Sequence, residues 1–167
     1  MSTNIPQRQY AVKLDADNVS ADIPPRTAAG DAFSALVVQI FRLNGLLLSA
    51  GDLLGDPVGQ TSARWRALAA VEEKPMTVAQ IARTWGLARQ SVQRVADVLV
   101  KEGLAVYEEN PNHRRAQLLV LTPKGRSVLR TIQSAQRVWA DRLGTEIGEG
   151  DLRHASAILD RVLQSVQ

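Results

Sequence analysis

The stretch from residue 77 to residue 122 constrains the fold more than any other part of the chain. Thr77 is followed three residues later by Gln80, the spacing of a capping box, so a helix is expected to begin at Val78. Apolar residues then recur at helical spacing as far as Trp85. Gly86 follows, where a left-handed cap residue is favoured. The segment therefore predicts a short amphipathic helix with marked ends.

A second helix is expected from about Arg89 to Glu102, with Gly103 ending it. Its apolar face would bury Val92, Val95, Ala96 and Leu99, and its polar face carries Arg89, Gln90, Ser91, Gln93, Arg94, Asp97 and Lys101. Two helices joined by a short glycine-containing turn are typical of a helix-turn-helix. Arg and Gln pair bidentately with guanine and adenine in the major groove, although a polar face that is merely solvated remains the alternative.

Two strands with a basic tip follow the second helix. They are expected at Leu104–Glu109, with Leu104 and Val106 on one face, and at Ala116–Leu121. The segment Asn110-Pro111-Asn112 predicts a turn between them. The tip carries His113, Arg114 and Arg115. A hairpin with cations at its tip beside a recognition helix is a wing, and the combination is more specific than either part.

These residues resemble the MarR family of bacterial transcription regulators, which are homodimeric winged helix-turn-helix proteins. The matching segments are ARWRAL (63–68), TVAQIA (77–82), GLARQSVQR (86–94), KEGL (101–104), NPNHRR (110–115) and LTPKG (121–125). Residues from about 31 to 166 follow the family's order of elements. The resemblance implies DNA binding through Arg89, Gln90, Ser91, Gln93, Arg94, His113, Arg114 and Arg115.

The resemblance also implies roles for two charged positions. An acid at the position of Asp97 can pair with the second wing cation, here Arg115, and so anchor the wing; a solvated acid is the alternative. Family wings usually carry an Asp where this chain has His113. A histidine there can gain a proton beside phosphate, so DNA affinity is expected to rise as the pH falls from about 8 to 6. A solvated turn residue is the alternative.

Charge is distributed unevenly along the chain. Residues 61–126 hold 11 Lys/Arg and 6 Asp/Glu, whereas residues 1–60 hold 4 and 6, and residues 127–167 hold 5 of each. A basic segment between near-neutral flanks is typical of a polyanion-binding module, although a solvated basic face is common. The absence of cysteine from the sequence excludes disulfides, thiolate metal sites and a cysteine redox switch.

Helices are expected on both sides of the basic segment. The first would begin at Asp31 and carry an apolar stripe of Phe33, Leu36, Val37, Ile40, Leu43 and Leu47. Residues 51–60 would form a loop, and a helix from Thr61 or Ser62 would end near Lys74. Beyond the wing, one helix would run from Pro123 to Leu143, and a last one, capped by Asp151, would carry a seam of apolar residues.

The predicted fold is therefore mainly α with a small β-hairpin wing. Residues 1–30 would be a flexible arm, in which the alternation of Tyr10, Val12 and Leu14 leaves a short extended segment open. Residues 61–122 would be the DNA-binding domain. Residues 31–60 and 123–167 would form the dimerisation region, as the resemblance also implies. By inspection of the sequence, no apolar run approaches the roughly 20 residues of a membrane span, and the first residues have no apolar signal-peptide core. A cytoplasmic protein is therefore expected.

Patterns that would indicate an enzyme are missing from the sequence. It has no Walker or Rossmann glycine pattern, and His113 and His154 are too few to predict a metal site, so neither catalytic residues nor a cofactor nor a metal is predicted. The resemblance implies a possible small aromatic or anionic ligand between the dimer helices and the winged module. Its walls here would include Arg42, Asn44, Arg64 and Trp65.

Three functions are compatible with these observations. The leading one is a homodimeric, sequence-specific DNA-binding regulator that represses its own or neighbouring genes by binding an inverted repeat. The second is a winged-helix protein-interaction module that does not read DNA. An enzyme with an unrecognised site is a distant third. Binding to a palindromic duplex with a steep salt dependence separates the first from the others.

Overall fold

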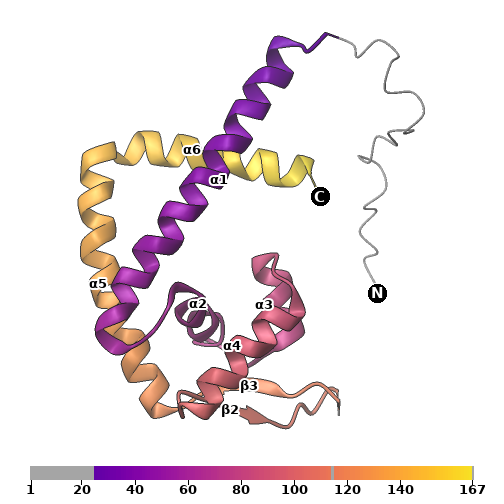
Figure 1. The fold of residues 1–167 in the computed structure, drawn as a ribbon, viewed down its shortest axis with the longest axis vertical. Helices are drawn as coiled ribbons and strands as arrows, with labels where there is room; N and C mark the ends of the chain where they lie inside the picture. Colours follow the sequence, from indigo (N-terminus) through magenta and orange to yellow (C-terminus); the bar gives the residue numbers. More distant parts are fainter. Residues whose placement is uncertain (1–24, 114, 167) are drawn as a thin grey trace. The chain divides into compact units, whose positions relative to one another are not determined.

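The computed structural model describes residues 25–113 and 115–166. The elements are α1 (Ala28–Gly55), the 3₁₀ helix η2 (Asp56–Val58), α2 (Ser62–Ala70), β1 (Met76–Thr77), α3 (Val78–Trp85), α4 (Arg89–Lys101), β2 (Ala105–Glu108), β3 (Leu118–Leu121), α5 (Pro123–Ile147) and α6 (Glu149–Ser165). They form two units, residues 38–140 and the two ends of the chain (up to residue 37 and from residue 141). Figure 1 shows the elements in sequence order.

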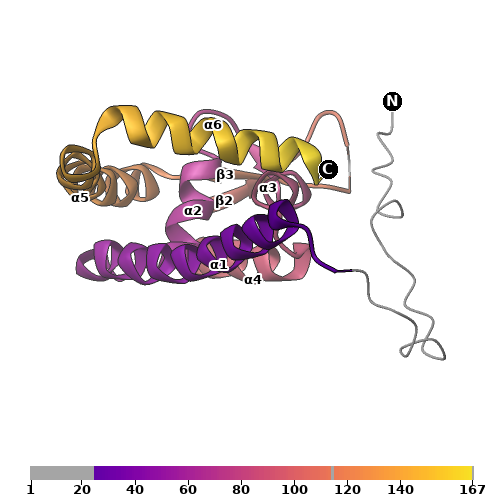
Figure 2. The same ribbon diagram turned by 90° about the horizontal axis from the view of Figure 1, so that it is seen from above.

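The winged helix-turn-helix lies within the unit of residues 38–140. Its sheet has the order β1-β3-β2, and both pairs are antiparallel. Helices α2, α3 and α4 gather beside these strands in both views (Figures 1 and 2). The predicted fold class, mainly helical with a small wing, is confirmed. The sheet has one strand more than the predicted hairpin, because Met76 and Thr77 pair with Leu119 and Leu118 before α3 begins.

The core of this unit is formed by the apolar faces of the helices and the inner face of the sheet. Its most deeply buried large side chains, each less than 2% exposed, are Leu68, Ile81, Leu99, Leu104, Leu119, Leu129 and Ile132. The predicted inner face of the second helix is confirmed at Val92, Ala96 and Leu99, and Val95 is partly buried. Trp85, the last residue of α3, is 43% exposed, and the Arg66 guanidinium lies over its ring, 5.9 Å from the ring centroid.

The strand β2 has the opposite register to the predicted one. Ala105 is buried and Tyr107 is half-buried, whereas Val106 is exposed. Leu104 is buried as expected, but it precedes the strand, so its burial does not set the strand's alternation. Because successive strand residues point to opposite faces, Tyr107 lies on the same side as Ala105 and faces α4.

Helix α1 continues to Gly55, into the first half of the segment 51–60 that was predicted to be a loop, and η2 follows it. Its last residues include Gly51 and Gly55, both buried. A Cβ at Gly51 would meet the Ser62 side chain at 2.8 Å, and one at Gly55 would collide with the Gln60 carbonyl oxygen. The glycines therefore allow the chain to return closely against the helix rather than breaking it. The Asp52 carboxylate accepts a hydrogen bond from the Ser62 amide at 2.7 Å and fixes this return.

Helix α1 is strongly apolar and exposed within the chain. By length and composition alone the segment Ala28–Val58 is able to cross a membrane, with a mean hydropathy of 1.5, and none of that apolar window is buried. This corrects the expectation that no apolar run approaches the length of a membrane span. The exposed large side chains on α1 are Phe33, Val38, Phe41, Leu43, Leu46, Leu47 and Leu53. An uncovered surface of this kind requires a partner or a membrane.

The two C-terminal helices also differ from their predicted bounds. Helix α5 continues through Gly144 to Ile147, and Gly148 ends it with a φ of 96°. Helix α6 then begins at Glu149, with Gly148 at its N-cap, so Asp151 lies within the first turn and does not cap the helix. Similarly, α2 ends at Ala70 rather than near Lys74, and α1 begins at Ala28 rather than Asp31. The predicted alternation at Tyr10, Val12 and Leu14 lies outside the described residues.

Candidate nucleic-acid interface

The capping of α3 fixes the turn that leads into α4. The Thr77 amide donates to the Gln80 side-chain oxygen at 2.7 Å, and the Gln80 amide donates to the Thr77 hydroxyl at 3.2 Å, so the predicted capping box is confirmed. Gly86 has a φ of 61° and caps the helix end in the left-handed conformation, also as predicted. Because both ends of α3 are fixed, the three residues after it place the start of α4 in a defined position.

The first turn of α4 is exposed. Arg89, Gln90 and Ser91 occupy this turn, and Arg94 lies one turn further along the same helix; all four are exposed. The side chains of Arg89, Gln90 and Arg94 form no hydrogen bond or ion pair with any residue in the described parts of the chain. Their donors and acceptors are therefore available to a partner at the end of the helix that enters the groove in helix-turn-helix docking.

Gln93 lies in a different environment from these four residues. Its side-chain nitrogen Nε2 donates to the Asp97 oxygen Oδ1 at 2.8 Å and to the Tyr107 hydroxyl at 2.7 Å. The Tyr107 hydroxyl in turn donates to the same Asp97 oxygen at 2.8 Å. The two bonds of the Tyr107 hydroxyl connect α4 to strand β2 of the wing, and the Gln93–Asp97 bond joins successive turns of α4.

The predicted pairing of Asp97 with Arg115 is wrong in this structure. No ion pair within 4.0 Å joins them, although both residues are among those described. Asp97 instead contacts the wing through Tyr107, which the sequence did not single out. Arg115 lines a hollow of about 280 Å³ together with Asp97 and Arg89, between the start of α3, the face of α4 and the wing.

Burial, together with the hydrogen bond to Asp97 and its negative charge, raises the pKa of Tyr107 from 10.0 to about 12. The neutral hydroxyl is therefore the donor in the Asp97 contact over the physiological range. Since the folded pKa exceeds the ordinary value of 10.0, the stabilisation from this proton is complete below about 10 and is lost as the pH rises towards 12.

The wing tip is a tight turn with exposed basic side chains. The His113 amide donates to the Asn110 carbonyl at 3.1 Å, and the Asn112 amide donates to the Asn110 side chain at 3.0 Å, which confirms the predicted turn. His113 and Arg115 are exposed. Arg114, predicted as a DNA contact, lies outside the described residues. The DNA-binding roles of these three residues stay predictions.

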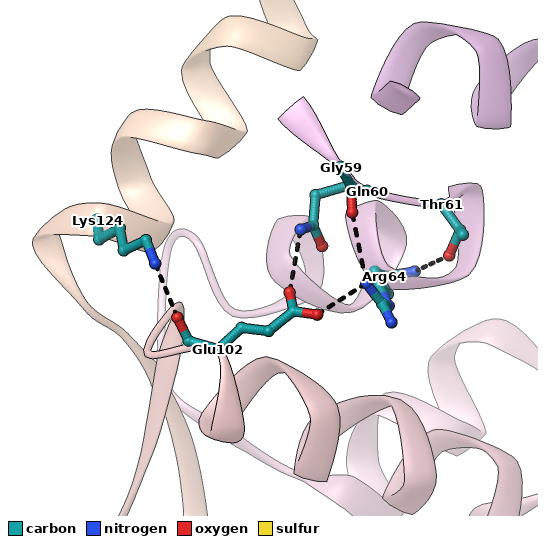
Figure 3. Close-up of polar contacts among 6 residues, drawn as sticks. All are labelled: Gly59, Gln60, Thr61, Arg64, Glu102 and Lys124. Carbon is teal, nitrogen blue, oxygen red and sulfur yellow. Dashed lines mark hydrogen bonds and ion pairs between the residues drawn. The ribbon is translucent and has the colours of Figure 1, made fainter. Parts of the chain in front are cut away.

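A second polar network fixes the other end of α4. Glu102, which follows the last residue of the helix, accepts hydrogen bonds from Arg64 Nη1 at 2.9 Å and from Gln60 Nε2 at 3.1 Å. Its backbone carbonyl accepts from Lys124 Nζ at 2.9 Å. Figure 3 shows Glu102 between Lys124 of α5 and the chain around Gly59. The recognition helix is thereby connected to the residues that follow α1 and to the start of α5.

Two of the four predicted ligand residues lie on α1 and two lie on α2. Arg64 forms an ion pair with Glu102. Trp65 is half-buried, and its ring nitrogen has no hydrogen-bond partner within the described chain. Arg42 and Asn44 are exposed on α1. No hydrogen bond joins any two of these four residues in residues 25–113 and 115–166. A role for them in ligand binding stays a prediction.

We expect Glu102→Ala to lower the free energy of unfolding by about 1–2 kcal/mol, because Arg64 and Gln60 both lose an acceptor in a partly buried place. Arg153→Gln is the matched control, since it removes the exposed pair with Glu149 and should change stability by less than about 0.5 kcal/mol. Urea unfolding of both variants measures the difference. Equal losses would contradict an anchoring role for Glu102.

The chain is similar to known proteins in sequence and in fold. A family model described as the MarR family matches residues 59–116. Uncharacterized protein Rv2011c of Mycobacterium tuberculosis is 39% identical over 137 residues, which cover 82% of this chain and 96% of that protein.

Solved structures share the fold at lower identity. The transcriptional repressor CouR bound to a 23-mer DNA duplex aligns with a TM-score of 0.70 and 24% identity, over 83% of this chain and 99% of that chain. CouR from Rhodococcus jostii RHA1 bound to p-coumaroyl-CoA aligns with a TM-score of 0.68 and 21% identity, over 76% and 90% of the two chains.

Proposed function

The chain belongs to the MarR family of transcription regulators, and from this premise we propose that it acts as a homodimer that binds an inverted-repeat DNA duplex and represses transcription. The observation that carries the proposal is the set of unpaired polar side chains in the exposed first turn of α4. Arg89 and Gln90 can reach base edges there, while the basic wing lies on the same module. The chain would act in the cytoplasm, by binding and without catalysis.

The exposed apolar surface of α1 supports the homodimer. A second copy of the chain would cover Phe41 and Leu46, which are 71% and 69% exposed, and would remove them from water. The exposed apolar residues of α6, Leu152, Ile158 and Leu163, offer a further surface of the same kind. Two-fold symmetry would then present two copies of α4 to the DNA.

We expect Phe41→Glu to convert the dimer into a monomer. The free energy needed to bury an unpaired carboxylate in the apolar interface would exceed the free energy gained by association. Gln39→Glu is the matched control, since it places the same charge at a polar position of the same helix and should leave the dimer intact. Size-exclusion chromatography with light scattering distinguishes the two states. A monomeric wild type would contradict the dimer. A wild-type protein that requires detergent for extraction would favour α1 as a membrane span.

A small ligand would relieve repression. One structure shows a CouR repressor bound to a DNA duplex, and another shows CouR from Rhodococcus jostii RHA1 bound to p-coumaroyl-CoA, so proteins of this fold bind both kinds of partner. For this chain we propose a small aromatic or anionic effector. The alternative is a winged-helix module that contacts proteins only. It would not explain why Arg89 and Gln90, at the start of α4, are exposed and without a partner in the described parts of the chain.

Selection of genomic fragments by the purified protein tests the proposed function. The expected result is enrichment of an inverted repeat with half-site centres roughly one helical turn apart. Affinity for that duplex should fall steeply with salt, with a slope of about −0.9 for each neutralised phosphate. Recovery of fragments without a common sequence would favour non-specific binding, and recovery of none would favour the protein-interaction module.

A further inference from the structure

We propose that Gln93 positions the wing and does not read adenine, because its amide nitrogen is held by hydrogen bonds to both Tyr107 and Asp97. The inference rests on the proposed function, since it assigns roles within the DNA-binding helix. The observation behind it is the closed network of three hydrogen bonds, each 2.7–2.8 Å long, among these side chains. Gln93 and Tyr107 are both half-buried, unlike the neighbouring Gln90.

The orientation of the Gln93 amide follows from the chemistry of its partners. An ionised carboxylate only accepts hydrogen bonds, so the group that faces Asp97 Oδ1 has to be a donor. The Tyr107 hydroxyl has one hydrogen, which it donates to the same carboxylate oxygen. It can therefore only accept from Gln93. Turning the amide round would place its oxygen against the carboxylate and leave the hydroxyl without its donor, so the nitrogen faces both partners.

This arrangement removes Gln93 from bidentate adenine recognition. A glutamine that reads adenine donates to N7 and accepts from the N6 amino group, and so requires a free hydrogen and a free oxygen on one amide. The side-chain nitrogen of Gln93 is already bonded to Tyr107 and Asp97, so donation to adenine would require these bonds to be weakened or broken. Gln90 has no partner within the described chain and keeps both groups. Gln90 is therefore the glutamine of this helix that is equipped to read adenine.

The same network determines where the wing lies. Tyr107 belongs to β2 and pairs with the buried Leu119 of β3, so both wing strands are connected to α4 through one hydroxyl. The turn that begins at Asn110 follows three residues later. Since Arg89 and Arg115 line the hollow beside the network, loss of the Tyr107 hydroxyl would also change the spacing between base-reading and wing cations.

The network can be tested without DNA. The chain contains two tyrosines, so Tyr10→Phe leaves Tyr107 as the only one. Ultraviolet titration of tyrosinate in this variant should give a pKa of about 12, and adding Asp97→Asn should move it towards 10, because the carboxylate contributes to the shift. Titration at the ordinary value in both proteins would overturn the network itself, whatever the protein binds.

The role of Gln93 is tested by selecting duplexes from a random library with wild type, Gln93→Ala, Tyr107→Phe and Gln90→Ala. Gln93→Ala and Tyr107→Phe should each weaken binding by about 3- to 10-fold on every sequence and leave the preferred bases unchanged. The protein with both Gln93→Ala and Tyr107→Phe should bind DNA with an affinity within about 2-fold of that of the weaker single variant, because both changes break the same network. Gln90→Ala, the matched control on the same helix, should instead relax one or two positions.

Two results would overturn the inference. One is a Gln93→Ala protein that loses preference for adenine at a position that Tyr107→Phe still selects. The other is additive losses in the double variant, which would mean that the two side chains act independently. Failure of the wild type to select any duplex would instead reject the proposed function, and the tyrosine titration would still decide whether the network exists.

Discussion

Gly125→Ala is expected to destabilise the protein by about 1–3 kcal/mol or more, because a Cβ there would collide with the backbone carbonyl oxygen of Leu104. That carbonyl cannot move freely, since it also accepts a hydrogen bond from the Thr122 amide at 3.1 Å. The Thr122 hydroxyl in turn accepts from the Gly125 amide at 3.0 Å and donates to the Gly103 carbonyl at 2.8 Å. The start of α5 is thereby held against the end of α4, and the substitution would force them apart.

The same substitution at Gly144 provides a matched control. Gly144 lies in the same helix, and a Cβ there would meet no atom within 4 Å in the described parts of the chain. Gly144→Ala should therefore stabilise the helix by about 0.5–1 kcal/mol, as alanine loses less backbone entropy on folding. Thermal unfolding should place the two variants on opposite sides of wild type, with Gly125→Ala lower by roughly 5–10 °C. Similar melting temperatures for all three proteins would mean that the contact with Leu104 is relieved at little cost.

The elements around the interface could be predicted from the sequence because their signals are local. Thr77 and Gln80 define the start of α3 by reciprocal bonds three residues apart, and Gly86 defines its end. The turn at Asn110 is likewise made by bonds within four residues. Such contacts depend on neighbours in the chain and not on how distant parts pack.

The network around Tyr107 could not be predicted in the same way. Its formation depends on the register of β2, and Leu104 and Val106 have an alternation that suggests the opposite face. A shift of one residue in a strand exchanges its two faces, so the predicted register places Tyr107 on the face away from α4. The predicted pairing of Asp97 with Arg115 followed instead from the family resemblance. Which face of β2 contacts α4 is set by its pairing with β3 and its packing on α4, and the residue pattern of one short strand does not determine it.

The predicted helix ends at glycines are wrong for a related reason. A loop was predicted from Gly51 and a helix end before Gly144, yet Gly51 and Gly55 lie in α1 and Gly144 lies in α5. At Gly51 and Gly55 the missing side chain admits Ser62 and Gln60, which is a tertiary requirement that no local pattern reveals. Glycine disfavours a helix by only about 1 kcal/mol, so a long apolar helix such as α1 or α5 can continue through it.

Arg89→Ala is expected to weaken binding to the selected operator by about 1–3 kcal/mol and to relax one or two of its base positions. Arg89 is the first residue of α4, is exposed, and forms no ion pair in the described parts of the chain, so its five donors are free for a guanine edge. Gln90→Ala should behave similarly at a neighbouring position. Competition binding with the operator and with random duplex measures both effects.

Lys101→Ala separates base reading from charge. It removes one positive charge from the same exposed helix, but at its opposite end, where the docked helix is not expected to reach the bases. If Lys101 contacts phosphate, its loss should weaken operator and random duplex by the same factor and reduce the salt slope by about 1. Arg89→Ala should weaken the operator more than random duplex, since a base contact exists only on the correct sequence. Equal losses on both duplexes for Arg89→Ala and Gln90→Ala would mean that the start of α4 contributes charge alone, and that the sequence is read elsewhere.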